Sequence, residues 1–132
     1  MKWIGLVILV AIVALLAWIR LAPDDAARWH TLPDSVSDDD MAGGVMRVVP
    51  GDLAALDGII RAEPRTQVLA GSVEAGMVTY VTRSRVFGFP DYTTVAQRGD
   101  DLAIHARLRY GQSDMGVNKA RVERWLTALR QG

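Results

Sequence analysis

Cysteine is absent from the 132 residues of this chain, and histidine occurs only twice, as His30 and His105. Without cysteine the protein can form no disulfide, no thiolate metal site and no cysteine-linked lipid anchor. No Gly-x-Ser-x-Gly elbow and no Walker-type or dinucleotide loop occurs either. We therefore expect no metal or cofactor and no enzyme activity. Catalysis stays a minor alternative, in which Ser84 or Ser113 would have to meet a histidine.

Nucleic-acid binding is not expected, because the aromatic residues are not interleaved with basic ones as stacking platforms require. Net charge is zero over the whole chain but uneven along it. The segment from Leu21 to Gly44 holds six acidic residues and one arginine, whereas the remainder from Val45 is mildly basic. Neither part resembles a polyanion-binding tail.

A single long apolar run, Trp3–Ile19, has no charged residue. As a helix it would be about 26 Å long, close to the thickness of a bilayer core, and Arg20 could extend it by snorkelling. Trp3 and Trp18 stand at opposite ends, where tryptophan prefers the headgroup level. The small residues of a signal-peptidase site are missing. Residues 1–22 are therefore predicted to be an uncleaved transmembrane anchor.

The tail before the anchor is only Met1 and Lys2. Such a short tail is typical of a signal anchor, so we expect the domain on the non-cytoplasmic side, at the cell envelope. Residues 23–44 are rich in Asp, Pro, Ser and Gly and are predicted to be an acidic linker or irregular arm. Within it, Trp29 is expected to pack the arm onto the domain.

Residues 45–132 show a regular alternation of apolar patterns and turn signals. Strands are predicted at Val45–Val49, Thr66–Val73, Met77–Phe87, Asp91–Arg98 and Leu102–Tyr110, and helices at Gly51–Ala62 and Val117–Leu129. The order β-α-β-β-β-β-α predicts an α+β domain in two layers. An antiparallel sheet of about five strands would carry both helices on its apolar face, like a reduced helix-grip fold.

Two stretches resemble the uncharacterised family known as domain of unknown function 1499. One has the aromatic-Gly-aromatic break at Phe87–Phe89 followed by Pro90 and Asp91, and the other reads Ser113-Asp114-Met115-Gly116-Val117-Asn118. An Arg28-Trp29-His30 start also fits, and the resemblance spans roughly residues 28–130. It implies domain limits but no activity, cofactor or catalytic residue.

Asn118 is expected to share an inward helix face with Val122 and Trp125, where a buried amide needs a partner. We predict that Asn118 is a structural clamp, which hydrogen-bonds to backbone groups left unpaired by the Gly88–Pro90 break. Ser113 or Asp114 would cap the helix. In the alternative, Asn118 lines a ligand cavity. The candidate ligand or structural site comprises Phe87, Phe89, Asp91, Ser113, Asp114, Asn118 and Trp125.

A second candidate surface consists of arginines that alternate on two predicted strands. Arg83 and Arg85 lie on one strand, Arg107 and Arg109 on the other, and His105 stands beside the second pair. If these faces coincide, the open side of the sheet is basic. It could be an ordinary solvated face, or it could meet anionic headgroups or an acidic partner.

The sequence thus predicts a membrane-anchored, non-catalytic envelope protein. It would bind a small apolar or lipid-like ligand between the sheet and the C-terminal helix. Alternatively, it is an accessory protein that docks a partner protein or an anionic membrane surface through the basic sheet face.

Overall fold

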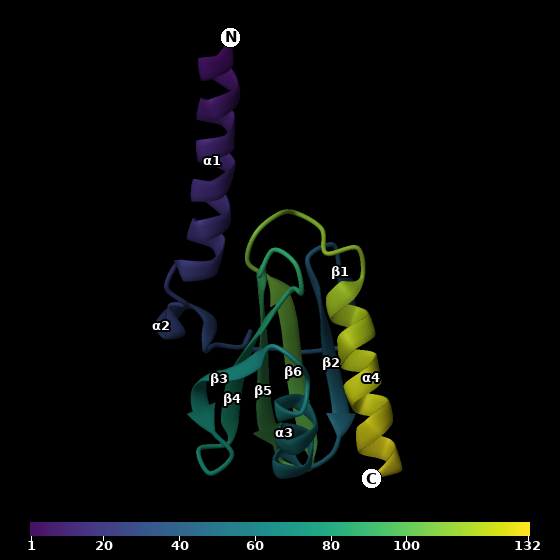
Figure 1. Cartoon of the computed structure of the whole chain (residues 1–132). Coiled ribbons are helices and arrows are strands. Elements are labelled where there is room, and N and C mark those ends of the chain that lie inside the picture. The colour runs from purple at the N-terminus through teal and green to yellow at the C-terminus, as the bar shows by residue number, and fades with distance from the viewer.

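A computed structural model describes all 132 residues of the chain. Its first element is the helix α1 (Lys2–Leu21), which stands away from the folded domain (Figure 1). Nearly all its side chains are exposed, and its length and composition suit a membrane span or a signal sequence. Only its last turn reaches the domain, where Ile19 and the following Ala22 are buried.

The domain is built on one antiparallel sheet of six strands in the order β1-β2-β6-β5-β4-β3. The strands are β1 (Asp39–Met41), β2 (Gly44–Pro50), β3 (Thr66–Ser72), β4 (Met77–Arg83), β5 (Pro90–Arg98) and β6 (Asp101–Leu108). The pairs β3–β4, β4–β5 and β5–β6 are neighbours in sequence joined by short connections, as antiparallel strands can be. The α+β class and the antiparallel sheet are as the sequence predicts.

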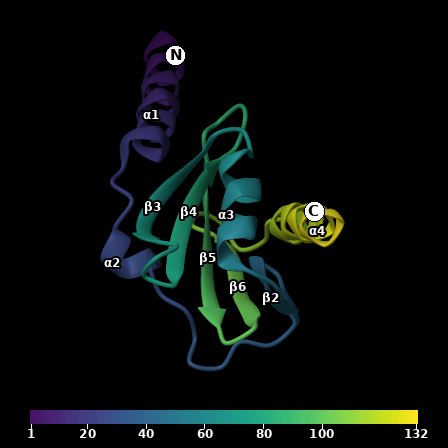
Figure 2. The same ribbon diagram turned by 90° about the horizontal axis from the view of Figure 1, so that it is seen from below.

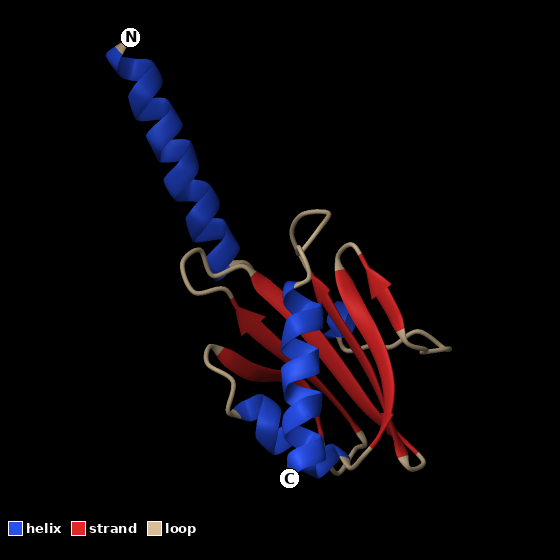
Figure 3. Cartoon of the chain, turned by 90° about the vertical axis from the view of Figure 1, so that its right-hand side faces the viewer, coloured by secondary structure: helices blue, strands red, loops and turns tan.

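Two helices, α3 (Leu53–Arg61) and α4 (Val117–Gln131), cover one face of this sheet (Figures 2 and 3). Asp52 caps α3 by accepting a hydrogen bond from the Ala55 N–H. A core of 13 buried residues lies between the helices and the sheet, with Tyr80, Ile104 and Trp125 among its members. Every second residue of β4 and β6 faces this core, as the pleat of a strand requires.

The boundaries differ from prediction in two places. The strand expected to run to Phe87 ends at Arg83, since the Ser84 hydroxyl accepts the Phe89 N–H and closes a loop. The strand β1 lies in the segment expected to be linker and makes the sheet six-stranded. Its sequence Asp-Asp-Met has no β-branched residue, so the sequence pattern does not predict a strand there.

The second face of the sheet is covered by residues 23–38, which we call the arm. It contains the short helix α2 (Ala26–Trp29), on the side of the sheet opposite α3 and α4 (Figure 2). The indole of Trp29 stacks on the Tyr92 ring with centroids 4.2 Å apart and planes 12° apart. The expectation of an open, solvated sheet face is therefore wrong, because the arm occupies it.

Candidate functional site

Asn118 is fully buried in the first turn of α4 and belongs to a polar network under that turn. Its amide nitrogen donates to the Asp114 carboxylate at 2.9 Å, and its oxygen accepts from the Arg121 guanidinium at 3.2 Å. The same guanidinium nitrogen lies 3.3 Å from an Asp91 oxygen. The inward direction of Asn118 matches the helical spacing. The predicted partner, backbone of the Gly88–Pro90 break, is wrong, since side chains of α4, β5 and the preceding loop take that role.

The start of α4 is organised by Asp114 more than by a residue at the cap itself. Gly116 is the N-cap and has a left-handed backbone with φ of 79°. The Asp114 carboxylate accepts the N–H groups of Gly116 and Asn118, whereas the Ser113 hydroxyl accepts that of Met115. Burial raises the pKa of Asp91 despite the Arg121 guanidinium beside it. Ser113, Asp114, Asn118 and Asp91 thus form one structural cluster.

The layer between the sheet and α4 is filled with side chains. Trp125 is 3% exposed, and its indole N–H donates to Glu63 at 2.8 Å. Val122 and Leu126 pack on either side of it against the sheet. Two hollows lie next to α4, one of about 290 Å³ beside Ile59 and Trp125 and one of about 220 Å³ beside Val49 and Leu129. Asn118 lines neither of these two hollows, and Trp125 lines only the first.

Three residues of the predicted basic sheet face are engaged by the arm. Arg107 donates to the Trp29 carbonyl and to the Thr94 hydroxyl. Arg109 donates to the Pro23 carbonyl at 2.9 Å, and Arg83 pairs with Asp24 at 2.9 Å. This face is therefore a docking site for the chain's own arm and not an open basic patch. The correction follows from the acidic arm, whose carboxylate and carbonyls meet the arginines.

Burial on the arm side changes the proton affinity of several groups. It lowers the pKa of His105 to about 4, with the Arg107 charge adding to the effect. It also lowers the pKa of Arg107 to about 10. Burial and the Asp24 carboxylate raise the pKa of the Tyr92 phenol to about 12.

Neither histidine hydrogen-bonds to a serine. The His30 ring nitrogen lies 2.8 Å from the Thr79 hydroxyl, on the arm side of the sheet. Instead, the hydroxyls of Ser84 and Ser113 each accept a backbone N–H of their own loop, from Phe89 and from Met115.

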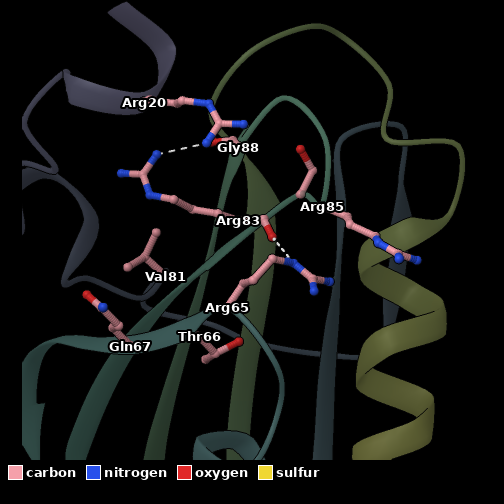
Figure 4. A pocket seen from close by; sticks show the side chains of 9 residues that line it. Arg20, Arg65, Thr66, Gln67, Val81, Arg83, Arg85 and Gly88 are labelled. Carbon is pink, nitrogen blue, oxygen red and sulfur yellow. Dashed lines mark hydrogen bonds between the residues drawn. The ribbon is translucent and has the colours of Figure 1, made fainter. Parts of the chain in front are cut away.

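The largest hollow lies where α1 meets the domain, and we call it the arginine pocket (Figure 4). It is open to one side, measures about 500 Å³ and has a single apolar lining residue, Val81. Arg20, Arg65, Arg83 and Arg85 contribute to its wall, together with Thr66, Gln67, Ser84 and Gly88. The guanidinium groups of Arg20 and Arg83 point toward one another beside Gly88, whereas the Arg85 side chain extends away toward α4 (Figure 4).

Charge in the arginine pocket is only partly neutralised. Arg83 pairs with Asp24, but Arg20, Arg65 and Arg85 take part in no salt bridge. Arg20 donates to the Val86 carbonyl at 2.5 Å, and Arg83 to the carbonyls of Ile19 and Gly88. These contacts fasten the Ser84–Phe89 loop to the end of α1. Arg20 and Arg65 are thus two unpaired positive charges in the wall of the pocket, and Arg85 is a third whose side chain extends away from it.

Sequence reasoning found Arg83 and Arg85 but missed Arg20 and Arg65. Arg20 ends the apolar run, so its position at the end of α1 could be foreseen, but its meeting with Val86 could not. Arg65 stands before β3 with φ of 56°, one of only two non-glycine residues with positive φ. Nothing in the residues Pro64 and Arg65 predicts that conformation.

These features define an α+β protein with an apolar N-terminal helix and an arm-covered sheet. The chain belongs to the protein family of unknown function DUF1499, whose profile matches residues 24–129. The resemblance seen in the sequence motifs is thereby confirmed. No curated protein and no solved structure shows significant similarity to it.

Proposed function

We propose that the protein is a membrane-anchored, non-catalytic module that holds the phosphate-bearing head of a lipid-like ligand in the arginine pocket. In this proposal α1 is an uncleaved span and the domain lies on the non-cytoplasmic side of the membrane. The arginine pocket offers charge and hydrogen-bond donors, and its two hydroxyl residues, Thr66 and Ser84, have no histidine or carboxylate beside them in the lining. Its chemistry is therefore that of binding.

The contacts of the α1–arm junction support an uncleaved anchor. Ile19 and Ala22 are each 4% exposed, although they lie at the end of a helix that is otherwise uncovered. Arg83 donates to the Ile19 carbonyl, and the Tyr92 hydroxyl donates to Asp24. Removal of residues 1–22 would take away the Ile19 carbonyl, the Arg20 bond to the Val86 carbonyl and two buried side chains, although Asp24 would stay. The domain is thus built to receive the end of α1.

The observation that carries the ligand class is the set of guanidinium groups without a carboxylate partner, Arg20, Arg65 and Arg85. Guanidinium groups bind phosphate oxygens with paired, charge-assisted hydrogen bonds. Arg20 is the last basic residue of α1, and if α1 spans the bilayer, a position at the end of the apolar run would bring the arginine pocket near headgroup depth. An anionic lipid headgroup therefore has the charge and the location that the pocket accepts.

Arg65 adds independent support, because its backbone conformation costs stability. A non-glycine residue with φ of 56° is held at a cost of about 1 kcal/mol. Glycine or asparagine would occupy this position with less strain. The arginine at this position supplies a guanidinium that neither replacement could, and its Nε donates to the Arg83 carbonyl at 3.0 Å.

The test is native mass spectrometry of the full chain, released from micelles that contain phosphatidylglycerol and phosphatidylcholine in equal amounts. The parent should retain phosphatidylglycerol in preference to phosphatidylcholine. The double variant Arg65→Asn with Arg85→Gln should lose that preference, since two of the unpaired charges are gone. Its stability should fall by no more than about 1 kcal/mol, because asparagine tolerates the left-handed backbone at position 65 and the bond from the Arg65 guanidinium to the Arg83 carbonyl is exposed.

Arg98→Gln is the matched control, because Arg98 is an exposed arginine at the far end of β5 and makes no salt bridge. It should retain phosphatidylglycerol like the parent. Equal retention of the two lipids by the parent, or an unchanged preference in the double variant, would contradict the proposed function.

The anchor itself has a separate test. Carbonate extraction should leave the full-length chain in the membrane fraction, and a C-terminal alkaline phosphatase fusion should be active in a bacterial host. A soluble form beginning near Pro23 would show that α1 is removed. An inactive fusion together with an active cytoplasmic reporter would reverse the assigned side.

A further inference from the structure

Exposed large apolar side chains outside α1 gather at one end of the domain. There are five of them, Val86, Phe87, Phe89, Met115 and Val117. They belong to two segments, the Ser84–Phe89 loop between β4 and β5 and the Met115–Val117 segment at the start of α4. We call these two segments the apolar tips. The opposite end of the sheet, with the β3–β4 and β5–β6 turns, exposes no large apolar residue.

The fold does not require apolar residues at these positions. Met115 is 93% exposed and has φ of 53°, so neither the core nor the backbone favours methionine there. Phe87 is 48% exposed, and its aromatic neighbour is the half-exposed Phe89 ring, with centroids 5.9 Å apart. A group of exposed apolar residues on one end of a molecule indicates a contact surface.

The place of the apolar tips relative to α1 identifies what they contact. Both tips lie at the end of the sheet from which α1 departs, and the loops rise beside its last turns (Figures 1 and 3). Arg20 in the last turn of α1 donates to the Val86 carbonyl, which fixes the Ser84–Phe89 loop at the level of the helix end. The Phe89 and Tyr110 rings lie with centroids 6.4 Å apart and planes tilted by 58°, and they join this loop to the segment that leads to Met115.

We propose that the apolar tips insert into the interfacial layer of the bilayer that α1 spans, and so form a second membrane contact. The occupant is the lipid bilayer, since the tips stand at the depth where Arg20 would meet headgroups. Phenylalanine and methionine gain free energy at that depth by leaving water. The contact fixes the orientation of the domain relative to the bilayer. This inference rests on the proposed span by α1 but not on the headgroup preference of the arginine pocket.

The absence of cysteine makes a direct test possible in the full chain. Single variants Phe87→Cys and Met115→Cys are labelled with an environment-sensitive nitrobenzoxadiazole dye and reconstituted in vesicles of pure phosphatidylcholine. Ala75→Cys, in the exposed turn between β3 and β4, is the control at the far end. Val10→Cys, in the middle of α1, reports the span itself.

Labels at 87 and 115 should show blue-shifted emission and quenching several-fold stronger than the label at 75. Lipids with a nitroxide near the headgroup should quench them more than lipids with a nitroxide near the chain end, and the reverse should hold at position 10. Circular dichroism of each variant checks that the fold is kept, which the exposure of all four positions favours.

Emission and quenching at 87 and 115 equal to those at 75, with the label at 10 quenched, would overturn the second membrane contact and leave the span intact. An unquenched label at 10 would overturn both. Because the vesicles are zwitterionic, loss of the headgroup preference leaves these results unchanged, so the two proposals fail separately.

Discussion

The two faces of the sheet are covered by different chemistry. On the helix side, Tyr80, Ile104 and Val122 belong to a continuous apolar core between sheet and helices. On the arm side, the apolar cluster consists of only Trp29, Val81 and Tyr92, with Leu69 beside it. Hydrogen bonds and ion pairs to Arg83, Arg107 and Arg109 provide most other contacts there.

This difference predicts two levels of stability in one domain. Burial of apolar area is non-directional and sums over many contacts. A hydrogen bond adds only about 0.5–1.5 kcal/mol, and loss of a few can release a segment. We therefore expect the arm to open locally while the helix side stays folded. Four substitutions or conditions test this comparison.

The largest effect is expected at Ile104, in the middle of β6 and 1% exposed. Ile104→Ala should lower the free energy of unfolding by about 4 kcal/mol, because a cavity forms in a filled core. Urea unfolding of the full chain in detergent, followed by circular dichroism, measures it. Val86→Ala is the control at an exposed site and should stay within about 0.5 kcal/mol of the parent. A similar loss in both variants would contradict the contrast between core and surface.

Trp29 is the buried apolar residue on the arm side that corresponds to Ile104 on the helix side. Trp29→Ala should cost about 3 kcal/mol, at the low end for a tryptophan, since the arm can collapse around the gap. Hydrogen exchange should rise in the arm, while α4 keeps its protection. Trp29→Phe keeps a ring on Tyr92 and removes an indole N–H that is buried without a partner. It should recover most of the loss. Equal loss of protection in α4 would show that the two faces unfold together.

The same contrast explains what could be predicted from sequence. The strand β6 and the helices α3 and α4 have regular apolar spacing, and the structure places them within a few residues of expectation. The elements of the helix side can be predicted from that periodicity, because they pack by burial of apolar surface area. The arm has no periodicity, so its course over the sheet depends on contacts between distant residues such as Asp24 and Arg83.

The candidate sites show the same limit. Asn118 points inward, which helical spacing predicts, but its partners depend on where Asp91 and Arg121 meet in space. Alternation placed Arg83, Arg107 and Arg109 on one face but was wrong for Arg85, which lies beyond the end of β4, and it could not show that the arm would occupy that face. The arginine pocket includes Arg20 and Arg65, which are far apart in the sequence and are brought together by the fold.

Asn118 is a polar exception within the helix side and should have an intermediate effect. Asn118→Leu removes the donor to Asp114 and the acceptor for Arg121, and should cost about 2 kcal/mol. Ala120→Leu adds the same side chain at an exposed position of α4 and should stay near the parent stability. Urea unfolding compares them. Parent-like stability of Asn118→Leu together with loss of a bound lipid would assign Asn118 to a binding site and reject its structural role.

The smallest effect concerns pH and should be confined to the arm side. Burial beside Arg107 lowers the pKa of His105 to about 4, whereas an unfolded histidine titrates near 6.5. The unfolded chain therefore binds a proton first as pH falls, so the stability contributed by neutral His105 is full above pH 6.5 and is lost toward pH 4. Because His105 is partly exposed, we expect a loss of about 1 kcal/mol.

His105→Gln cannot titrate, and subtracting its pH profile from that of the parent removes the contribution of the carboxylates. Parallel profiles between pH 7 and pH 4 would show that His105 is not held neutral. A slope confined to the parent, with exchange rising in the arm and not in α4, would place the pH-sensitive contacts on the face that the arm covers.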